Sequence, residues 1–103
     1  MLKTIWKFQL RTGHRAETLL NLPIGAKVIH IGCQNRDVYA WIELDRNQDE
    51  LEPRKFYTFH TGADFDDKGL HFIQTVVCTN TYVLHVYEKK EESFLTDNEM
   101  RIE

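Results

Sequence analysis

The segment from Phe59 to Phe72, FHTGADFDDKGLHF, holds the side chains best suited to chemistry in this chain. It carries two histidines, a Thr-Gly pair and three aspartates between aromatic residues. Histidine and aspartate can bind metal ions, and small residues after a strand can point backbone N–H groups at a phosphate. The same composition is also typical of a polar connection between two strands.

For metal chemistry, the spacing is unfavourable. None of the five histidines has a partner at the spacing of a helical HxxxH site or a zinc finger. The aspartates do not alternate as in a calcium-binding EF-hand loop. Histidines on neighbouring strands could still converge, His60 with His71 or His30 with His85, but such side chains are usually only hydrogen-bonded. The sequence therefore predicts no metal and no cofactor.

A phosphate cradle at the HTGAD stretch is the second interpretation. His60 or Lys68 could add positive charge there, but three nearby aspartates would repel a phosphate. The stretch also lacks the lysine and glycine spacing of a P-loop. We favour a turn that ends a strand, in which Gly62 supplies an unusual backbone angle.

Catalytic groups are sparse in the rest of the chain. Cys33 and Cys78 each lie within an apolar run, where thiols are usually inert core residues, and their spacing does not resemble a disulfide framework. Ser93 is the only serine and lies in the acidic C-terminal segment. The sequence predicts that this protein is not an enzyme.

Short runs of alternating polar and apolar residues indicate the elements that must position these side chains. The runs are KTIWKFQL, TLLNLPIGAKVIHIGC, VYAWIEL, RKFYTFH, LHFIQTVVC and YVLHVYE, and the charged stretch DRNQDELEP is predicted to be a loop. In KVIHIGC, the alternation places Ile29 and Ile31 on one face and His30 on the other. We predict an all-β fold, a small antiparallel sandwich or barrel-like roll of six to seven strands, in which most consecutive strands pair.

The predicted domain covers residues 1–88. Residues 89–103 are predicted to form an acidic C-terminal tail or a short helix. At 103 residues, the chain has room for one core, and a domain this small would gain stability from burial in a homo-oligomer.

Composition also narrows the partners. The net charge is −3, and residues 1–15 carry four basic and no acidic side chains. A basic start followed by an acidic remainder does not indicate a general nucleic-acid binder. No run has the length of a membrane span or the apolar centre of a signal peptide, so we expect a soluble protein of a reducing cytoplasm.

Aromatic residues are the main indication of a binding surface. Alternate residues from Val38 to Leu44 are apolar, which leaves Tyr39 and Trp41 on the opposite face of their strand. Neighbouring exposed aromatics often mark a partner surface or a stacking platform, although a sheet covered on both faces would bury them instead. The predicted ligand- or partner-binding residues are Tyr39, Trp41, Tyr57, His60, Thr61, Gly62, Asp64 and His85.

Several short motifs, in order, resemble one protein family. They are KTIWKFQL, LPIGAKVIHIGCQNRDVYAWIELD, RKFYTFHTGAD and YVLHVYE, which together span residues 2–88. The chain thereby resembles a family of short proteins encoded by bacteriophages and prophages that carry a domain of unknown function. That family usually has a glycine before the Thr-Gly pair, where this chain has His60. The resemblance implies a phage origin and expression in the cytoplasm of an infected bacterial host cell, and it carries over no active residue.

These observations lead to one main hypothesis and two alternatives. The main one is a non-enzymatic phage accessory or host-takeover protein that binds a host protein or sequesters a small molecule. The first alternative is an anti-defence domain that binds a nucleotide-like signal, with HTGAD backbone groups on the phosphate and an aromatic residue on the base. The second is a minor structural protein of the virion.

Overall fold

The computed structural model describes residues 1–13, 15–79 and 81–90, and within them it contains only strands and their connections. No helix in these residues could span a membrane. The strands are β1 (Lys3–Leu10), β2 (Ala16–Pro23), β3 (Lys27–Gln34), β4 (Asp37–Asp45), β5 (Leu51–His60), β6 (Leu70–Thr79) and β7 (Tyr82–Lys90). The all-β prediction is confirmed. The strand at the end of the expected domain continues to Lys90, and the rest of the expected tail lies outside the described residues.

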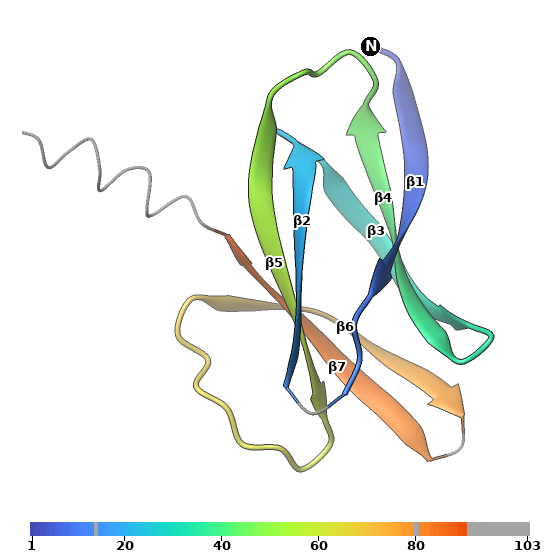
Figure 1. The fold of residues 1–103 in the computed structure, drawn as a ribbon, viewed down its shortest axis with the longest axis vertical. Coiled ribbons are helices and arrows are strands. Elements are labelled where there is room, and N and C mark those ends of the chain that lie inside the picture. Colours follow the sequence, from blue (N-terminus) through green and yellow to red (C-terminus); the bar gives the residue numbers. More distant parts are fainter. Residues whose placement is uncertain (14, 80, 91–103) are drawn as a thin grey trace, which may run out of the picture.

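The seven strands form two antiparallel sheets (Figure 1). One has the order β1-β4-β3 and the other the order β2-β5-β7-β6. Of the consecutive strands, only β3 with β4 and β6 with β7 pair directly, so the expectation that most consecutive strands pair was wrong. Within the four-stranded sheet, β7 lies between β5 and β6, and elsewhere the chain changes sheet after β1, β2 and β4. Each change lets the apolar face of a strand pack against the other sheet.

The core lies between the two sheets and follows the alternation of β4. Every second residue from Val38 to Leu44 is buried, at 0 to 3% exposure. These side chains form one cluster with Leu10, Leu22, Ala26, Ile31, Phe56, Val76, Leu84 and Val86. The core face predicted for β4 is therefore correct.

A β-bulge in β3 changes the predicted faces of that strand. Val28 pairs with Ile42 and His30 pairs with Trp41, so Ile29 is an extra residue between two pairs. Ile29 is 44% exposed, whereas Ile31 is fully buried. The predicted sharing of one face by these two isoleucines was wrong, because a bulge shifts the alternation by one residue.

The predicted charged loop before β5 is shorter than expected, because β5 begins at Leu51 and includes Pro53. Proline has no N–H for a strand ladder and is tolerated where a strand is an edge. Pro53 lies near the start of β5, where it pairs with Asn21 of β2.

A buried ion pair links the sheets in the interior. Arg54 of β5 and Glu88 of β7 are 4% and 7% exposed. Arg54 donates two hydrogen bonds to the Glu88 carboxylate, from Nε at 2.5 Å and from Nη2 at 3.1 Å. Its Nη1 donates to the carbonyl oxygen of Ala26, just before β3, at 2.6 Å. The guanidinium thus holds the four-stranded sheet against the start of β3.

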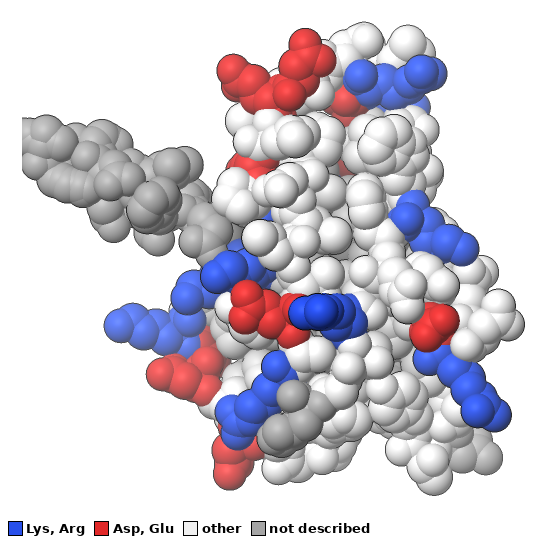
Figure 2. All heavy atoms as spheres, viewed as in Figure 1, with Lys and Arg blue, Asp and Glu red and all other residues white. Residues whose placement is uncertain are grey.

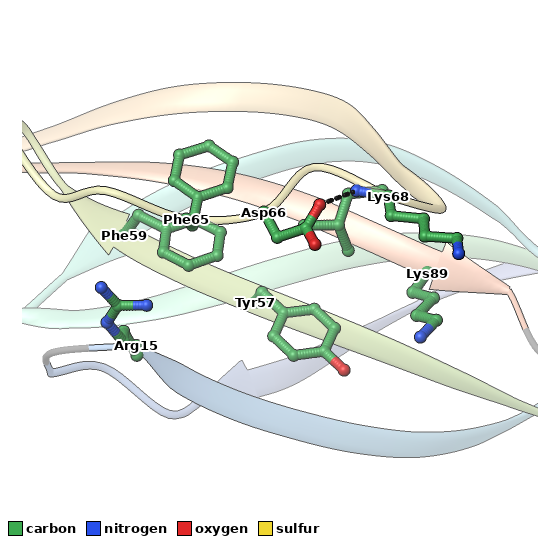
Figure 3. Close-up of a pocket in the computed structure, with 8 residues that line it drawn as sticks. Arg15, Tyr57, Phe59, Phe65, Asp66, Lys68 and Lys89 are labelled. Carbon is green, nitrogen blue, oxygen red and sulfur yellow. Dashed lines mark hydrogen bonds between the residues drawn. The ribbon is translucent and has the colours of Figure 1, made fainter.

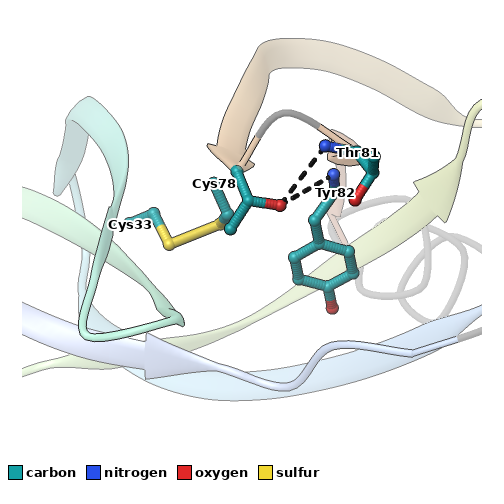
Figure 4. Close-up of a disulfide and its surroundings, with 5 residues drawn as sticks. Cys33, Cys78, Thr81 and Tyr82 are labelled. Atoms are coloured by element: carbon teal, nitrogen blue, oxygen red, sulfur yellow. Dashed lines mark hydrogen bonds between the residues drawn. A yellow bond between two sulfur atoms is a disulfide. The ribbon is translucent and has the colours of Figure 1, made fainter.

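Two further contacts join β3 to β6 along the neighbouring edges of the sheets. The side-chain amide of Gln74 accepts a hydrogen bond from the Ile31 N–H at 2.9 Å and donates one to the Ile31 carbonyl at 2.6 Å. Beyond them, Cys33 and Cys78 form a disulfide with Cα atoms 5.4 Å apart (Figure 4). The expectation of two inert thiols was wrong, because the sequence does not show that strands 45 residues apart meet edge to edge.

Removing one member of the buried ion pair should be strongly destabilising. In Arg54→Met, the Glu88 carboxylate would stay buried without its cation, which typically costs about 3–5 kcal/mol. Urea denaturation measures the free energy of unfolding. The combined Arg54→Met and Glu88→Leu variant removes both charges and should recover most of the loss. A single variant within about 1 kcal/mol of the wild type would contradict this role.

The disulfide should stabilise the fold through the chain it closes. For a closed loop of this size, the loop-entropy relation gives about 4 kcal/mol. Urea denaturation with and without a thiol reductant should show a loss of this order in the wild type. The Cys33→Ala and Cys78→Ala double variant is the control, and reductant should not change its stability. Equal sensitivity of both proteins would show that the bond is absent or makes no contribution.

Candidate functional site

The segment 61–69, called here the 61–69 loop, folds back over the outer face of the four-stranded sheet. Phe59 points outward from β5, yet it is only 5% exposed. Phe65 of the loop covers it, with ring centroids 3.9 Å apart and ring planes 8° apart. Figure 3 shows these two rings overlapping above the strand. The opening segment of the sequence is therefore a connector that packs on the sheet.

Further rings hold the loop in place. Tyr87 of β7 meets Phe59 and Phe65 edge to face, with centroids 5.7 and 5.1 Å away. Phe72 of β6 meets Tyr87 in the same manner at 5.4 Å. Such edge-to-face pairs are favourable arrangements for aromatic side chains. Through Phe65, the loop is thus anchored to β5 and β7.

Backbone turns close both ends of the loop. The Ala63 N–H donates to the His60 carbonyl at 3.1 Å, and Gly62 has a φ of 93°, as the turn interpretation predicted. At the other end, the Leu70 N–H donates to the Asp67 carbonyl at 3.0 Å, and the Lys68 N–H donates to Asp66 Oδ1 at 3.0 Å. Since the Ala63 amide is already bonded within the turn, it does not contribute to a phosphate cradle at HTGAD.

Between the loop and the strands lies a hollow of about 260 Å³, called here the outer hollow (Figure 3). Its apolar wall consists of Tyr57, Phe59, Phe65 and Leu70, and its charged rim of Arg15, Asp66, Lys68 and Lys89. A second, adjoining hollow is lined by Asp66, Lys68, Gly69 and Lys89. The three basic residues of the rim come from three separate segments: the start of β2, the loop and β7.

The rim is positive although the protein is acidic. Three cations and one carboxylate line the outer hollow, whereas the whole chain has a net charge of −3. In Figure 2, blue and red side chains lie close together on the side that carries the 61–69 loop. A local excess of positive charge favours an anionic ligand there.

The structure divides the predicted binding residues between two sheets. Tyr57 lines the outer hollow. Tyr39 and Trp41 instead lie on the outer face of the three-stranded sheet, with their ring centroids 6.2 Å apart. There the Lys7 ammonium lies 4.6 Å from the Tyr39 ring centroid, and His30 packs beside Trp41 at 5.5 Å. The predicted residues therefore do not form one continuous surface.

The other predicted residues lie at the start of the 61–69 loop or contact it. His85 Nε2 is 2.8 Å from the Thr61 hydroxyl, and its Nδ1 is 2.9 Å from the Thr75 hydroxyl. Both ring nitrogens are thus engaged in fixing the loop to β6 and β7. His60 packs near Tyr82, with centroids 5.8 Å apart, and Asp64 is exposed.

Of the described histidines, His30 and His85 do not converge as a metal site would require. His30 and His85 lie on different sheets. Within residues 1–13, 15–79 and 81–90, no group of three or more His, Cys, Asp or Glu side chains could hold a metal ion.

Sequence reasoning missed most of the residues that line the outer hollow. They are Arg15, Phe59, Phe65, Asp66, Leu70 and Lys89, while Lys68 was considered only as a positive charge beside the HTGAD stretch. One signal was present, because a phenylalanine within a loop of aspartates indicates a ring that packs back on the sheet. The convergence of Arg15 and Lys89 had no signal, since it depends on strand pairing between distant segments.

A third opening, separate from the two hollows above, lies between the sheets, where β1 and β2 face each other. It measures about 470 Å³ and is lined in part by Trp6, Pro23 and Leu51. Trp6 of β1 lines this opening and is 53% exposed. Figure 2 shows a mainly uncharged surface in this region.

Comparison with known proteins adds one match. A family model with the description "Domain of unknown function (DUF7352)" matches residues 1–95. Comparisons with curated proteins and with solved structures find no match. The description of the family states no activity, so the outer hollow is the basis for a functional argument.

Removing the Phe65 ring should loosen the loop. Phe65→Ala would uncover Phe59 and remove two ring contacts, with an expected loss of about 2 kcal/mol in the free energy of unfolding. Urea denaturation measures the loss, and limited proteolysis should show faster cleavage within residues 61–69. Phe72→Ala is the control, because Phe72 is already 57% exposed and lies outside the loop. Equal stability and equal cleavage in both variants would mean that the ring does not anchor the loop.

Proposed function

This chain belongs to the DUF7352 family, and from that premise we propose that it is a non-enzymatic binding protein that sequesters a small anionic molecule with a flat ring. The proposed setting is that of a phage accessory or host-takeover protein in the cytoplasm of an infected bacterium. The resemblance of the motifs in residues 2–88 supports this origin.

One observation carries the proposal, the combination of stacked rings and positive charge in the outer hollow. The ring planes of Tyr57 and Phe59 are within 5° of each other, with centroids 6.4 Å apart. Phe65 covers Phe59 and leaves Tyr57 beside it as part of the wall. A flat ring placed over Tyr57 would lie in the same layer as Phe65, with Arg15 at one end of the hollow and two lysines at the other (Figure 3).

The chemistry of the lining supports binding rather than turnover. The residues that line the outer hollow offer rings, cations and one carboxylate, without a nucleophile paired to a base. The rings already pack on one another, so the wall is preformed and a ligand would not have to order it.

A second candidate function rests on the other sheet. Tyr39, Trp41 and His30 share the outer face of the three-stranded sheet with Ile5, which is 52% exposed. Neighbouring aromatic and aliphatic side chains on an open sheet face suit a protein partner. This face is the proposed surface for a host protein, and for a second copy of the chain if the protein is a homo-oligomer.

Binding of ring-bearing anions tests the main proposal. A thermal-shift screen with nucleoside monophosphates of all four RNA bases should raise the melting temperature for at least one of them, because a ligand of the folded state stabilises it. Tyr57→Ala should weaken that ligand by about 5- to 150-fold in titration calorimetry, as expected for loss of one stacking partner.

The matched control is Tyr39→Ala, which removes the same side chain from the other sheet. It should leave the affinity unchanged, while Tyr57→Phe should keep it near the wild-type value. Circular dichroism verifies that each variant is folded. If no monophosphate shifts the melting temperature, or if both alanine variants lose affinity equally, the outer hollow is not the binding site for such ligands.

A further inference from the structure

We infer that the ligand of the outer hollow carries a phosphate group, which is held between Lys68 and Lys89 at one end of the hollow. This inference rests on the proposed function and specifies the class of ligand, a free phosphorylated nucleoside or a similar phosphorylated ring compound. This position differs from the HTGAD backbone, which the sequence analysis considered as a phosphate site.

The first argument comes from the register of the sheet. Lys55 of β5 pairs directly with Lys89 of β7, and both side chains are on the outer face. Like charges opposite each other are unfavourable in an antiparallel pair. Lys55 has a counter-charge, since its Nζ lies 3.7 Å from a Glu17 carboxylate oxygen. Among the described residues, no carboxylate forms an ion pair with Lys89 or with Lys68.

The second argument is the position of the two ammonium groups. Figure 3 shows Lys68 and Lys89 at the same end of the hollow, with Arg15 at the opposite end and Tyr57 between them. Both lysines also line the adjoining hollow, together with Asp66 and Gly69. A Cβ atom at Gly69 would lie 3.6 Å from Lys89 Cε, so the backbone of the loop lies close to this lysine. Two ammonium groups at one end of a ring-lined hollow complement a group with two negative charges.

The third argument concerns the orientation of the ligand. Asp66 is the carboxylate of the rim, and the Lys68 N–H holds its Oδ1 at 3.0 Å. A carboxylate repels phosphate but accepts hydrogen bonds from amino or hydroxyl groups. The ring would therefore lie over Tyr57 with a donor group toward Asp66, and the phosphate would extend past Asp66 to the two lysines.

Titration calorimetry at one fixed salt concentration tests the inference. The probes are the four nucleosides and their 5′-monophosphates and 5′-triphosphates. For the preferred base, the monophosphate should bind at least about tenfold more tightly than the nucleoside, because it gains contacts to two cations. Lys68→Ala and Lys89→Ala should each remove most of this gain and leave the affinity for the nucleoside unchanged. Lys27→Ala, an exposed lysine of the other sheet, is the matched control and should change neither affinity.

The outcomes separate this inference from the proposed function. If a nucleoside binds but its phosphates bind no more tightly, or if the two lysine variants lose nucleoside and nucleotide affinity equally, the phosphate inference is wrong and the hollow still binds a ring. If nucleosides, monophosphates and triphosphates all fail to bind the wild type, the proposed function fails together with it.

A single-stranded oligonucleotide with a 5′-phosphate identifies the source of the phosphate. The inference expects it to bind no more tightly than the free monophosphate of the same base. Tighter binding of the oligonucleotide would overturn the assignment to a free small molecule and indicate the end of a nucleic-acid chain instead. The salt dependence of both affinities provides a second measurement, because each phosphate contact to a lysine weakens as salt is raised.

Discussion

The guanidinium of Arg54 is the contact on which the arrangement of the two sheets depends. It lies on β5 in the four-stranded sheet, is held by Glu88 of β7, and reaches the carbonyl of Ala26 at the start of β3. Buried charges must be paired and fully hydrogen-bonded, so this contact restricts how the sheets can face each other. β3 is an edge strand that pairs only with β4 in its own sheet. The hydrogen bonds of Gln74, the disulfide, the core packing of Ile31 and the Arg54 contact to Ala26 just before β3 attach it to the opposite sheet.

A sheet fixed in this way can carry a preformed hollow on its outer face. The inner side chains of β5 and β7 are committed to the core and to the ion pair, so the register of the two strands sets which side chains stand outside. That register places Tyr57 opposite Tyr87 and Phe59 opposite His85. The 61–69 loop then adds Phe65 above Phe59. The same contacts that stabilise the domain thus position the wall and the rim of the hollow.

Local patterns predicted the elements of this fold but not the way they pair. The strand at residues 3–10 and the buried face of β4 follow from alternation, which depends only on neighbouring residues. The bulge at Ile29 breaks the alternation without a sequence signal, and the outward face of β3 was therefore assigned wrongly. Of the hollow, Tyr57 was predicted, while Arg15 and Lys89 were not. Both line the same hollow because β2 pairs with β5 and β5 pairs with β7, which only the folded chain reveals.

Whether the Cys33–Cys78 disulfide is formed depends on the redox conditions around the protein. In a reducing compartment the two sulfurs would stay apart, and the hydrogen bonds of Gln74 would join β3 to β6 without the covalent bond. In an oxidising compartment the bond would form. One amino-acid sequence would then exist as two chemical species, according to the redox state of its surroundings.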